Sequence, residues 1–484
     1  MVDLPPLPDE VRATLPPVVT AYIAALEAAV QTLTTANAAL AARVADLEAR
    51  HGQNSSNSSR PPSTDPPGTR TPPRVPGQRR PGGQPGHRGQ FRALVPAEQV
   101  DAIVRLVPEA CAACGGAVPV HAGAGDPPDH RHQVVDLPPV RATVTEYQVA
   151  ARLCSACGTV TRAPWPAEVP RGAVGPRLAA TSALLTGRYR LSKRETAQCL
   201  ADLFGAEVAV GTVSAIEQTV SAALAPVVDE ARAAAQQAVV ANVDETGWRQ
   251  GRQRAWLWTM VTALVTVFHI DRSRGSQVVR ALLGADWTGI VGSDRFAAYR
   301  WLATERRQVC WAHLKRDFQK LVDWGPGPRP VGERLLAIET QVFELWHRFR
   351  AGELDRVALA MATGRVAAEM AAVLEAGAER GHPAAQPLCR ELLAVWPALW
   401  TFVVVAGVEP TNNVAEQALR PAVLWRKGSF GTHSEGGSRF VERMLTVTAS
   451  CRQQRRNPFS FLVEAVTAAH RAQPHPSLLP VAPT

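Results

Sequence analysis

Hydrophobic residues recur on one face of a predicted helix over residues 22–50 of this 484-residue chain. Ile23, Val30 and Val44 alternate with a leucine at every seventh position, namely Leu26, Leu33, Leu40 and Leu47. β-branched residues at position a and leucine at d are typical of a parallel two-stranded coiled coil, and a polar a residue such as Asn37 sets the register. The pattern predicts a dimerising coil within residues 1–51. An alanine-rich helix packed on its own protein is the alternative.

Residues 52–92 show no hydrophobic period and hold nine Pro, seven Gly and seven Arg against a single acid, Asp65. Such a composition buries little apolar area, so the segment is predicted to stay extended and disordered. One interpretation is a plain linker. The other is a basic arm that lies on DNA phosphates or in a minor groove, with Arg79 and Arg80 as candidate contacts.

Two Cys-x-x-Cys-Gly sequences lie within residues 93–168, and short β-like runs at 133–137 and 143–150 separate them. Four thiolates satisfy tetrahedral Zn²⁺, so a structural zinc-binding domain is predicted with the ligands Cys111, Cys114, Cys154 and Cys157. Two unrelated pairs or a redox dithiol are the alternatives.

Residues 170–230 read as helices. A first helix covers 175–188, a second begins after Ser192 with Glu195 in the capping-box position, and a third covers 212–224 after a break at 205–211. Helix, break and helix resemble a helix-turn-helix, although an ordinary helical hairpin fits equally well. Lys193 and Arg194 suit phosphate contacts on either interpretation.

From residue 236 onward β-like runs alternate with helical ones, which indicates an α/β sheet. Strands are expected at 238–243, at 289–292, at 308–311 and, as a pair, within 255–270; a helix follows from Ala312. Residues 333–406 are rich in Ala and Leu and read as helical.

Three acids stand out in this part of the chain. Asp244 and Asp294 are expected at the carboxyl ends of apolar strands, where a carboxylate is costly unless it is paired, hydrated or bound to a metal. Glu416 is expected in the first turn of a helix that Asn412 or Asn413 caps. Any one of them is well explained as a turn cap or a partner of the helix dipole. Together they predict a site for two Mg²⁺ or Mn²⁺ ions and phosphoryl transfer.

Several basic residues accompany the acids and are candidates for DNA phosphate contacts: Lys315, Arg316, Arg420, Arg426 and Lys427. Contacts to phosphates position a protein on DNA. Surface ion pairs within the protein are the alternative for each of them.

Composition narrows the class of protein. Lys and Arg number 52 against 43 Asp and Glu, and the net charge of +9 is only a weak argument for a nucleic-acid partner. A hydrophobic share of 46% excludes a wholly disordered chain. Eight Cys are too few for a disulfide scaffold. Because we find no signal peptide and no run of about 18 uncharged apolar residues, we expect a reducing compartment and no membrane span.

The chain resembles insertion-sequence transposases of the DDE type, in the IS66 family, over residues 53 to 440. The resemblance rests on the two Cys-x-x-Cys pairs and on an ordered set of motifs: Asn54-Ser-Ser with Arg60-Pro-Pro-Ser, Arg80-Pro-Gly-Gly-Gln-Pro-Gly-His-Arg-Gly89, Val243-Asp-Glu-Thr-Gly-Trp248, Ser293-Asp294 with Ala298-Tyr299, Cys310-Trp-Ala-His-Leu-Lys-Arg-Asp-Phe318, Asn412-Asn-Val-Ala-Glu416 with Arg420-Pro, and Arg426-Lys427.

The resemblance implies a multidomain α/β protein with an RNase-H-like catalytic core over residues 236–425, in which Asp244, Asp294 and Glu416 bind the metal ions. Residues 325–408 would be a helical insertion, and residues 426–484 a C-terminal helical region and tail. One departure is Arg295, which follows Asp294 where a small residue is expected. The conformation of the turn after Asp294 is therefore not predicted, and the Arg295 side chain is a further cation that could contact DNA.

The implied activity is metal-dependent cleavage at the ends of an insertion sequence, followed by strand transfer to target DNA. Expected partners are the terminal inverted repeats, target DNA, a second copy or more through the coil, and companion proteins of the same element. The expected location is the bacterial cytoplasm, at the nucleoid. The alternatives are a non-catalytic zinc-bearing DNA-binding protein, either a regulator or a degenerate copy, and a hydrolytic nuclease of the same core fold.

Overall fold

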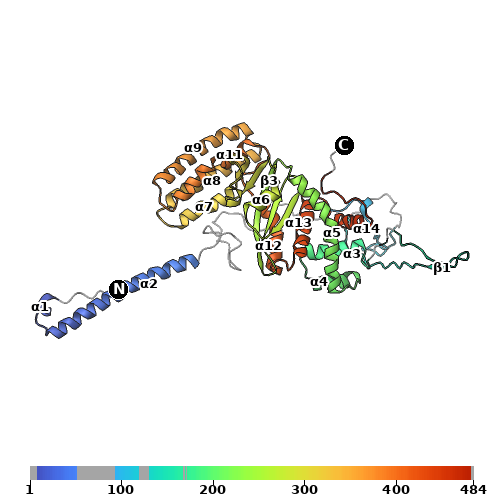
Figure 1. Ribbon diagram of the computed structural model, residues 1–484, viewed down its shortest axis with the longest axis horizontal. Coiled ribbons are helices and arrows are strands. Elements are labelled where there is room, and N and C mark those ends of the chain that lie inside the picture. Colours follow the sequence, from blue (N-terminus) through green and yellow to red (C-terminus); the bar gives the residue numbers. More distant parts are fainter. Residues whose placement is uncertain (1–7, 52–92, 119–129, 167–168, 170–171, 481–484) are drawn as a thin grey trace. The chain divides into compact units, whose positions relative to one another are not determined.

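The computed structural model describes residues 8–51, 93–118, 130–166, 169 and 172–480 (Figure 1). Two compact units divide the chain: the first comprises residues 1–71, 149–196 and 209–484, and the second residues 72–148 and 197–208. Arg79 and Arg80 lie outside the described residues. The domain boundaries expected from the sequence stay predictions.

The helix expected at 22–50 is confirmed as α2 (Pro17–His51), preceded by the short α1 (Asp9–Arg12). An ion pair of 2.8 Å joins Arg12 to Glu27. Along α2 the side chains of five a and d residues are exposed: Leu26, Val30, Leu33, Leu40 and Val44. Its pairing with a second copy stays a prediction.

The β-like runs expected at 133–137 and 143–150 form no strand in the described structure, so this expectation is wrong. Val134, Leu137 and Val144 are more than three-quarters exposed. A strand needs a partner for its backbone groups as well as alternating side chains, and no ladder pairs with these runs. The short strands β1 (Ala151–Leu153) and β2 (Val160–Arg162) pair instead, antiparallel, on either side of the second Cys-x-x-Cys.

A five-stranded mixed sheet forms the centre of the first unit, in the order β5-β4-β3-β6-β7. Its members are β3 (Val240–Gln250), β4 (Gln253–Val261), β5 (Thr266–Asp271), β6 (Ile290–Ser293) and β7 (Arg307–Val309). β3, β4 and β5 are antiparallel neighbours, whereas β6 and β7 run parallel to β3. The strands expected at 255–270, 289–292 and 308–311 are confirmed. β3 does not end at Asp244 as expected, because residues up to Gln250 continue to pair with β4 through the turn at Gly251.

Helices cover both faces of this sheet (Figure 1). On one face α3 (Pro176–Gly187), α5 (Val210–Ala235), α13 (Glu435–Gln453) and α14 (Pro458–His470) share a core with Val243, Met260 and Val291. α6 (Ser276–Leu283), between β5 and β6, adds Val279 and Leu283 to it. On the other face α12 (Asn413–Ser429) packs Leu419 and Ala422 against Trp248, Leu257 and Phe268.

The helices around the expected break are confirmed with shifted bounds. α4 (Lys193–Phe204) begins with the expected capping box: Ser192 N donates to Glu195 Oε2 over 2.8 Å, and Glu195 N donates to Ser192 Oγ over 3.2 Å. α5 is much longer than the expected 212–224, because Val227, Val228 and Ala231 prolong its buried face. A DNA-reading role for α4 and α5 stays a prediction.

The helical stretch expected between Asp294 and Glu416 is confirmed. It consists of α8 (Arg329–Arg350), α9 (Arg356–Arg380), α10 (Gln386–Ala394) and α11 (Trp396–Val404), which share a core with α7 (Trp311–Asp323). By length and composition, residues 17–41 of α2 and the whole of α9 could each cross a membrane, as could α10 and α11 taken together. In α9, however, Leu359, Met370 and Leu374 are fully buried in the core of these helices.

Both outer strands of the sheet lie against a helix. Along β5, Thr266 N donates to Ser450 Oγ and Phe268 N donates to Thr446 Oγ1, each over 3.0 Å, and Ile270 N donates to Glu442 Oε1. Along β7, Thr401 Oγ1 donates to Arg307 O over 2.6 Å, and Phe402 N donates to the Gln308 side chain over 2.8 Å. Side chains of α13 therefore meet three backbone N–H groups of β5, and α11 meets one backbone carbonyl and one side chain of β7.

Candidate functional site

The two aspartates lie side by side where β3 and β6 run parallel. Val240, Ala241 and Asn242 pair with Ile290, Val291 and Gly292. Two residues further in the same register, Asp244 stands opposite Asp294, which directly follows β6. The parallel alignment of two strands thus brings together two carboxylates that are fifty residues apart in the sequence (294 minus 244).

Glu416 reaches this edge from the first turn of α12. Asn412 is the N-cap residue by position, but its side chain makes no capping hydrogen bond, so the expected cap is wrong for Asn412; Asn413 is already the first helical residue. Burial is the main cause that raises the pKa of Asp244, and the charges of Asp294 and Glu416 add to it.

A chain of hydrogen bonds links the residues that precede the acids. Asn412 Nδ2 donates to Val243 O over 3.0 Å, and Asn412 N donates to Cys310 Sγ over 3.1 Å. Cys310 N in turn donates to Ser293 O over 2.8 Å. Val243 and Ser293 directly precede Asp244 and Asp294, so we call this set, Asn412, Cys310, Val243 and Ser293, the Asn412 bridge. Asn412 and Cys310 are each 1% exposed.

Two of the three acids, Asp244 and Asp294, have no ion-pair partner among the described residues. Burial raises the pKa of Asp244 well above its usual value, and the neighbouring charges of Glu245, Asp294 and Glu416 raise it further. In the part of the chain that the structure describes, no Lys, Arg or His pairs with Asp244 or Asp294. Glu416 does have partners, Arg316 at 3.2 Å and His313 Nδ1 at 3.6 Å.

Glu245 is a buried acid beside the site, and no motif in the sequence suggested a role for it. Because neighbouring residues of a strand point to opposite faces, Glu245 faces away from Asp244. It pairs with Arg274 over 2.7 Å and accepts a hydrogen bond from Tyr299 Oη over 3.2 Å. Burial raises its pKa, and the hydrogen bond from Arg274 opposes that shift. The Asp-Glu dipeptide was the only signal, and it does not distinguish a ligand from a supporting group.

His313 is a second residue that the sequence placed in a motif without a function. It lies on α7 with Arg316, one turn further along, and both approach Glu416. Burial and the charge of Arg316 lower the pKa of His313, although the charges of Asp294 and Glu416 oppose this. Its Nδ1 atom is buried and makes no hydrogen bond within the described residues.

Arg295, the departure noted in the sequence, is engaged within the protein. It pairs with Asp317 of α7 over 2.6 Å and also with Glu391 of α10. These carboxylates raise its pKa although burial lowers it. The guanidinium group therefore holds the helical insertion to the strand end that carries Asp294.

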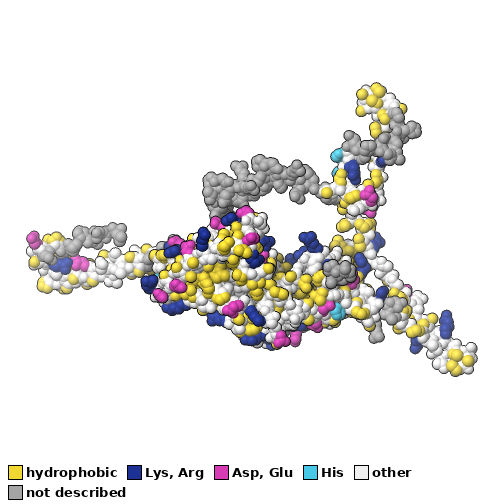
Figure 2. Space-filling model, turned by 90° about the horizontal axis from the view of Figure 1, so that it is seen from above, with side chains coloured by type: hydrophobic (Ala, Val, Ile, Leu, Met, Phe, Trp, Pro, Cys, Tyr) yellow, Lys and Arg dark blue, Asp and Glu magenta, His cyan; other side chains and the backbone are white. Residues whose placement is uncertain are grey.

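The basic candidates divide into paired and unpaired residues. Lys193 pairs with Glu217 over 2.9 Å, Lys315 pairs with the buried Glu339 over 3.0 Å, and Arg426 Nη1 donates to Thr246 Oγ1 over 3.0 Å. Three further candidates are exposed and have no ion-pair partner among the described residues: Arg194, Arg420 and Lys427. Figure 2 shows Lys and Arg interspersed with Asp and Glu over the face in view.

The two Cys-x-x-Cys-Gly sequences adopt the same local turn. Gly115 N donates to Cys111 O and Gly158 N to Cys154 O, each over 2.9 Å, and both glycines have positive φ, 69° and 73°. Backbone hydrogen bonds from Ala113 and Cys114 lower the pKa of Cys111. Hydrogen bonds from Thr159 lower the pKa of Cys157. The pairs Cys111–Cys114 and Cys154–Cys157 belong to different compact units, and each is described by itself.

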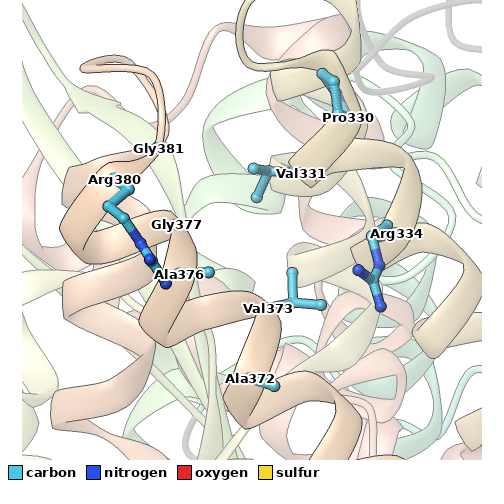
Figure 3. A pocket seen from close by; sticks show the side chains of 9 residues that line it. All are labelled: Pro330, Val331, Arg334, Ala372, Val373, Ala376, Gly377, Arg380 and Gly381. Carbon is cyan, nitrogen blue, oxygen red and sulfur yellow. The ribbon is translucent and has the colours of Figure 1, made fainter.

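No group of three or more His, Cys, Asp or Glu side chains within the described residues is gathered closely enough to hold one metal ion. One hollow of the described structure lies away from the acids. It lies between α8 and α9, where Arg334 and Arg380 stand on opposite sides of Val331, Val373 and Ala376 (Figure 3).

The geometry defines a mixed α/β protein with three acids at the edge of its parallel strands. The Transposase IS66 family model matches residues 171–439, more than half of the chain, and the chain belongs to this family. A second match, over residues 13–93, is to a family of unknown function.

Two curated relatives come from Sinorhizobium fredii. The uncharacterized protein y4qI is 25% identical over 246 residues, which cover 46% of this chain and 45% of the relative. The uncharacterized protein y4hP is 26% identical over 358 residues, which cover 65% of this chain and 62% of the relative. The chain thus spans less than two-thirds of either relative, and their names assign no activity.

Proposed function

We propose that this chain is a DNA transposase that cuts phosphodiester bonds at the ends of an insertion sequence and joins the freed ends to target DNA. Asp244, Asp294 and Glu416 would be the metal-binding acids of an RNase-H-like core. The observation that carries the proposal is the register of β3 and β6, which brings Asp244 and Asp294 to neighbouring strands, both without an ion-pair partner among the described residues. The charge of Glu416 also acts on Asp244. Family membership and the mixed sheet with α12 on one face support it.

The donor atoms are of the type that a hard divalent cation prefers, although within the described residues the three side chains are not gathered closely enough to hold one ion together, so the acids would have to approach one another when it binds. Carboxylate oxygens are the ligands that Mg²⁺ and Mn²⁺ prefer, and a carboxylate held near two others without a protein cation is costly unless an ion neutralises it. Two bound ions would supply activation of the attacking oxygen and stabilisation of the leaving oxygen. Arg316 pairs with Glu416 from the side of α7, while the Asn412 bridge fixes the backbone next to the acids.

The reaction needs no protein nucleophile. A water oxygen attacks the phosphorus at the element's end, and the 3′-oxygen leaves and takes up a proton as a 3′-hydroxyl. That hydroxyl then attacks a target phosphodiester, a new 3′ ester bond forms, and the target's own 3′-oxygen leaves. In each step one P–O bond to a 3′-oxygen breaks as a new P–O bond forms, to the water oxygen in the first step and to the attacking 3′-oxygen in the second.

DNA would be held by basic residues around this site and by the N-terminal parts. Arg194, Arg420 and Lys427 are exposed and unpaired in the described structure, whereas Lys193, Lys315, Arg316 and Arg426 would have to exchange an internal partner for a phosphate. Three further parts of the proposal rest on the sequence: DNA contacts by Arg79 and Arg80, zinc binding at the four paired cysteines, and dimerisation through α2.

The test is a nicking assay with the full chain, Mg²⁺ or Mn²⁺, and a plasmid that carries the element's terminal inverted repeats. Asp244→Asn, Asp294→Asn and Glu416→Gln should each lower the cleavage rate by at least about 10³-fold, because loss of one essential group removes most of the catalysis. DNA binding in a gel-shift assay should change by no more than about twofold. The matched control is Glu375→Gln on the exposed side of α9, which should cleave normally.

Any acid variant that nicks at the wild-type rate removes that acid from the site. A wild-type chain that binds the inverted repeats and never nicks them supports the non-catalytic alternative. Nicking without joining to a target identifies a nuclease instead.

A further inference from the structure

A second hollow lies one helical turn from Glu416. It has a volume of about 330 Å³, at the lower end of the range for small-ligand sites. Residues of the segment after α3 and of α12 line it, and we call them the arginine hollow: Arg188, Tyr189, Arg190, Gln417, Arg420, Pro421 and Leu424.

Positive charge dominates this hollow. Three of its seven lining residues are arginines and none is an acid. Among the described residues, no carboxylate pairs with Arg188, Arg190 or Arg420. Arg295, Arg316 and Arg439 of the same unit all have acidic partners. Three uncompensated guanidinium groups around one depression call for an anion with several negative oxygens, which guanidinium binds in a fixed planar geometry.

The hollow is built on anchored backbone rather than on a loose loop. Gly187, the last residue of α3, packs so closely on Met444 of α13 that a Cβ atom at this position would lie 2.8 Å from the methionine side chain. Arg190 adopts a positive φ of 65°, a left-handed conformation that non-glycine residues rarely take, and this turn sends Arg188 and Arg190 to the same depression. The other wall is α12, whose packing on the sheet is fixed by Leu419 and Ala422.

An aromatic ring and an apolar floor accompany the charges. Tyr189 is 57% exposed and Leu424 is 46% exposed, and Pro421 lies one turn before Leu424 on the same helix face. An exposed ring beside arginines is the arrangement on which unpaired bases stack while the backbone is held electrostatically. In duplex DNA the face of each base is covered by its neighbours, so such a ring favours a strand that is not paired.

We propose that the arginine hollow binds an unpaired DNA strand beside the bond that is cut. Arg188, Arg190 and Arg420 hold its phosphates, and the Tyr189 ring stacks on one base above Pro421 and Leu424. Arg420 follows Glu416 by four residues, about 6 Å along the helix, which is one to two nucleotides of DNA strand. The inference rests on the proposed function, because it names the form of DNA that the same site receives.

The test is binding in EDTA, so that no cleavage takes place and the acids play no part. Fluorescence anisotropy compares three labelled probes: a thymine homopolymer of about twenty nucleotides, a blunt duplex of mixed sequence, and the same duplex with a short unpaired thymine tail. Tyr189→Ala should weaken binding of the homopolymer and the tailed duplex at least about fivefold, the least expected when one base stack is removed. Binding of the blunt duplex should stay unchanged.

Two controls sharpen the measurement. Tyr189→Phe keeps the ring and should bind all three probes as the wild type does. Replacing Arg188 and Arg420 together by Ala should lower the slope of log K against log salt for the homopolymer by about 1.4, at about 0.7 for each phosphate that is no longer neutralised. Arg365→Ala, which removes an exposed charge on α9, should leave that slope unchanged.

The proposal is overturned if Tyr189→Ala binds the homopolymer and the tailed duplex like the wild type, or if blunt and tailed duplexes are weakened equally. The latter result would assign duplex phosphates to the hollow. Neither result bears on Asp244, Asp294 and Glu416, since their nicking assay is separate. If the acid variants do not nick DNA and Tyr189→Ala still binds the homopolymer and the tailed duplex like the wild type, only the proposal for the arginine hollow is refuted.

Discussion

At the scale of single residues, Asn412 connects three parts of the site: its carbonyl oxygen accepts from Glu416 N over 3.3 Å, and its side chain and backbone N–H reach β3 and Cys310. An asparagine before a helix ordinarily caps it by accepting hydrogen bonds from the first turn. Here the side chain instead donates to Val243 O, and its own Oδ1 has no partner among the described residues. Because Asn412 N also donates to Cys310 Sγ, and Cys310 N donates to Ser293 O, the start of α12 is fixed to Val243 within β3 and to the end of β6. We therefore regard Asn412 as a positioning residue for Glu416.

Asn412→Ala is expected to lower the free energy of unfolding by about 1–2 kcal/mol, because it leaves the buried Val243 carbonyl without its donor. It should also weaken Mn²⁺ binding, measured by titration calorimetry, at least about fivefold, since Glu416 is then no longer held in its approach to the aspartates. Asn413→Ala, at the exposed neighbouring position, is the matched control for both measurements. A variant that is less stable but binds Mn²⁺ with unchanged affinity would show that Asn412 is merely structural.

The same residue shows what the sequence alone can and cannot predict about the site. Asp244, Asp294 and Glu416 stand next to apolar runs or in a first helical turn, and those local signals were enough to select them. Asn412 acts on Val243, which is 169 residues away in the sequence (412 minus 243), and no local pattern records that contact. Lys315 and Arg295 looked free for DNA, but their acidic partners lie on α8 and α10.

At the scale of elements, α13 and β5 match each other in spacing. Glu442, Thr446 and Ser450 follow one another every four residues along the helix, and they accept from Ile270, Phe268 and Thr266, which alternate along the strand. Four helical residues advance by about 6 Å and two strand residues by about 6.8 Å, so one polar row meets every outward-facing N–H group in turn.

Thr446→Val should cost about 1–3 kcal/mol of stability, since it leaves the buried Phe268 N–H without an acceptor at almost no change in side-chain volume. The measurement is urea unfolding followed by circular dichroism. Thr448→Val on the same helix is the control, because the Thr448 hydroxyl donates only to carbonyls of α13 itself, chiefly Met444 O. Equal losses in the two variants would show that the strand does not depend on Thr446.

Element boundaries were predictable where local signals sufficed. Ser192 and Glu195 marked the start of α4 correctly, and the apolar runs located β4 to β7. The end of β3 was misplaced because the ladder with β4 carries the strand through polar residues up to Gln250. Runs 133–137 and 143–150 have the composition of strands, but no pairing segment lies beside them in the described structure. Pairing between distant segments is the part that sequence periodicity does not encode.

At the scale of the whole molecule, the proposed joining of two element ends would use one site from each of two copies, and the predicted coil of α2 would bring two copies together. Five of its a and d side chains are exposed, with Leu33 at 69% and Leu40 at 61%. Burying such a stripe against a second copy removes apolar surface from water on both helices. A parallel coil is the arrangement that the a and d residues favour.

Leu33→Glu should turn a dimer into a monomer in multi-angle light scattering, because it places two carboxylates in the seam of a parallel coil. The dimer's dissociation constant should rise at least about tenfold, the change that corresponds to about 1.4 kcal/mol. Thr35→Glu adds the same charge at an exposed position outside the seam and should stay dimeric. A wild-type chain that is monomeric at every concentration would dismiss the coil, and Asn37→Val should shift a true coil toward larger assemblies.

The occupied borders of the central sheet have a consequence for many copies crowded on one DNA molecule. Exposed sheet borders are templates on which neighbouring molecules add strands and precipitate. Because α13 lies along β5 and α11 lies along β7, few backbone groups of this sheet are available to pair with a strand of another molecule. We therefore expect that copies concentrated on DNA make reversible contacts through their helices. Fibrous aggregates should form only after α13 or α11 has detached from its edge strand.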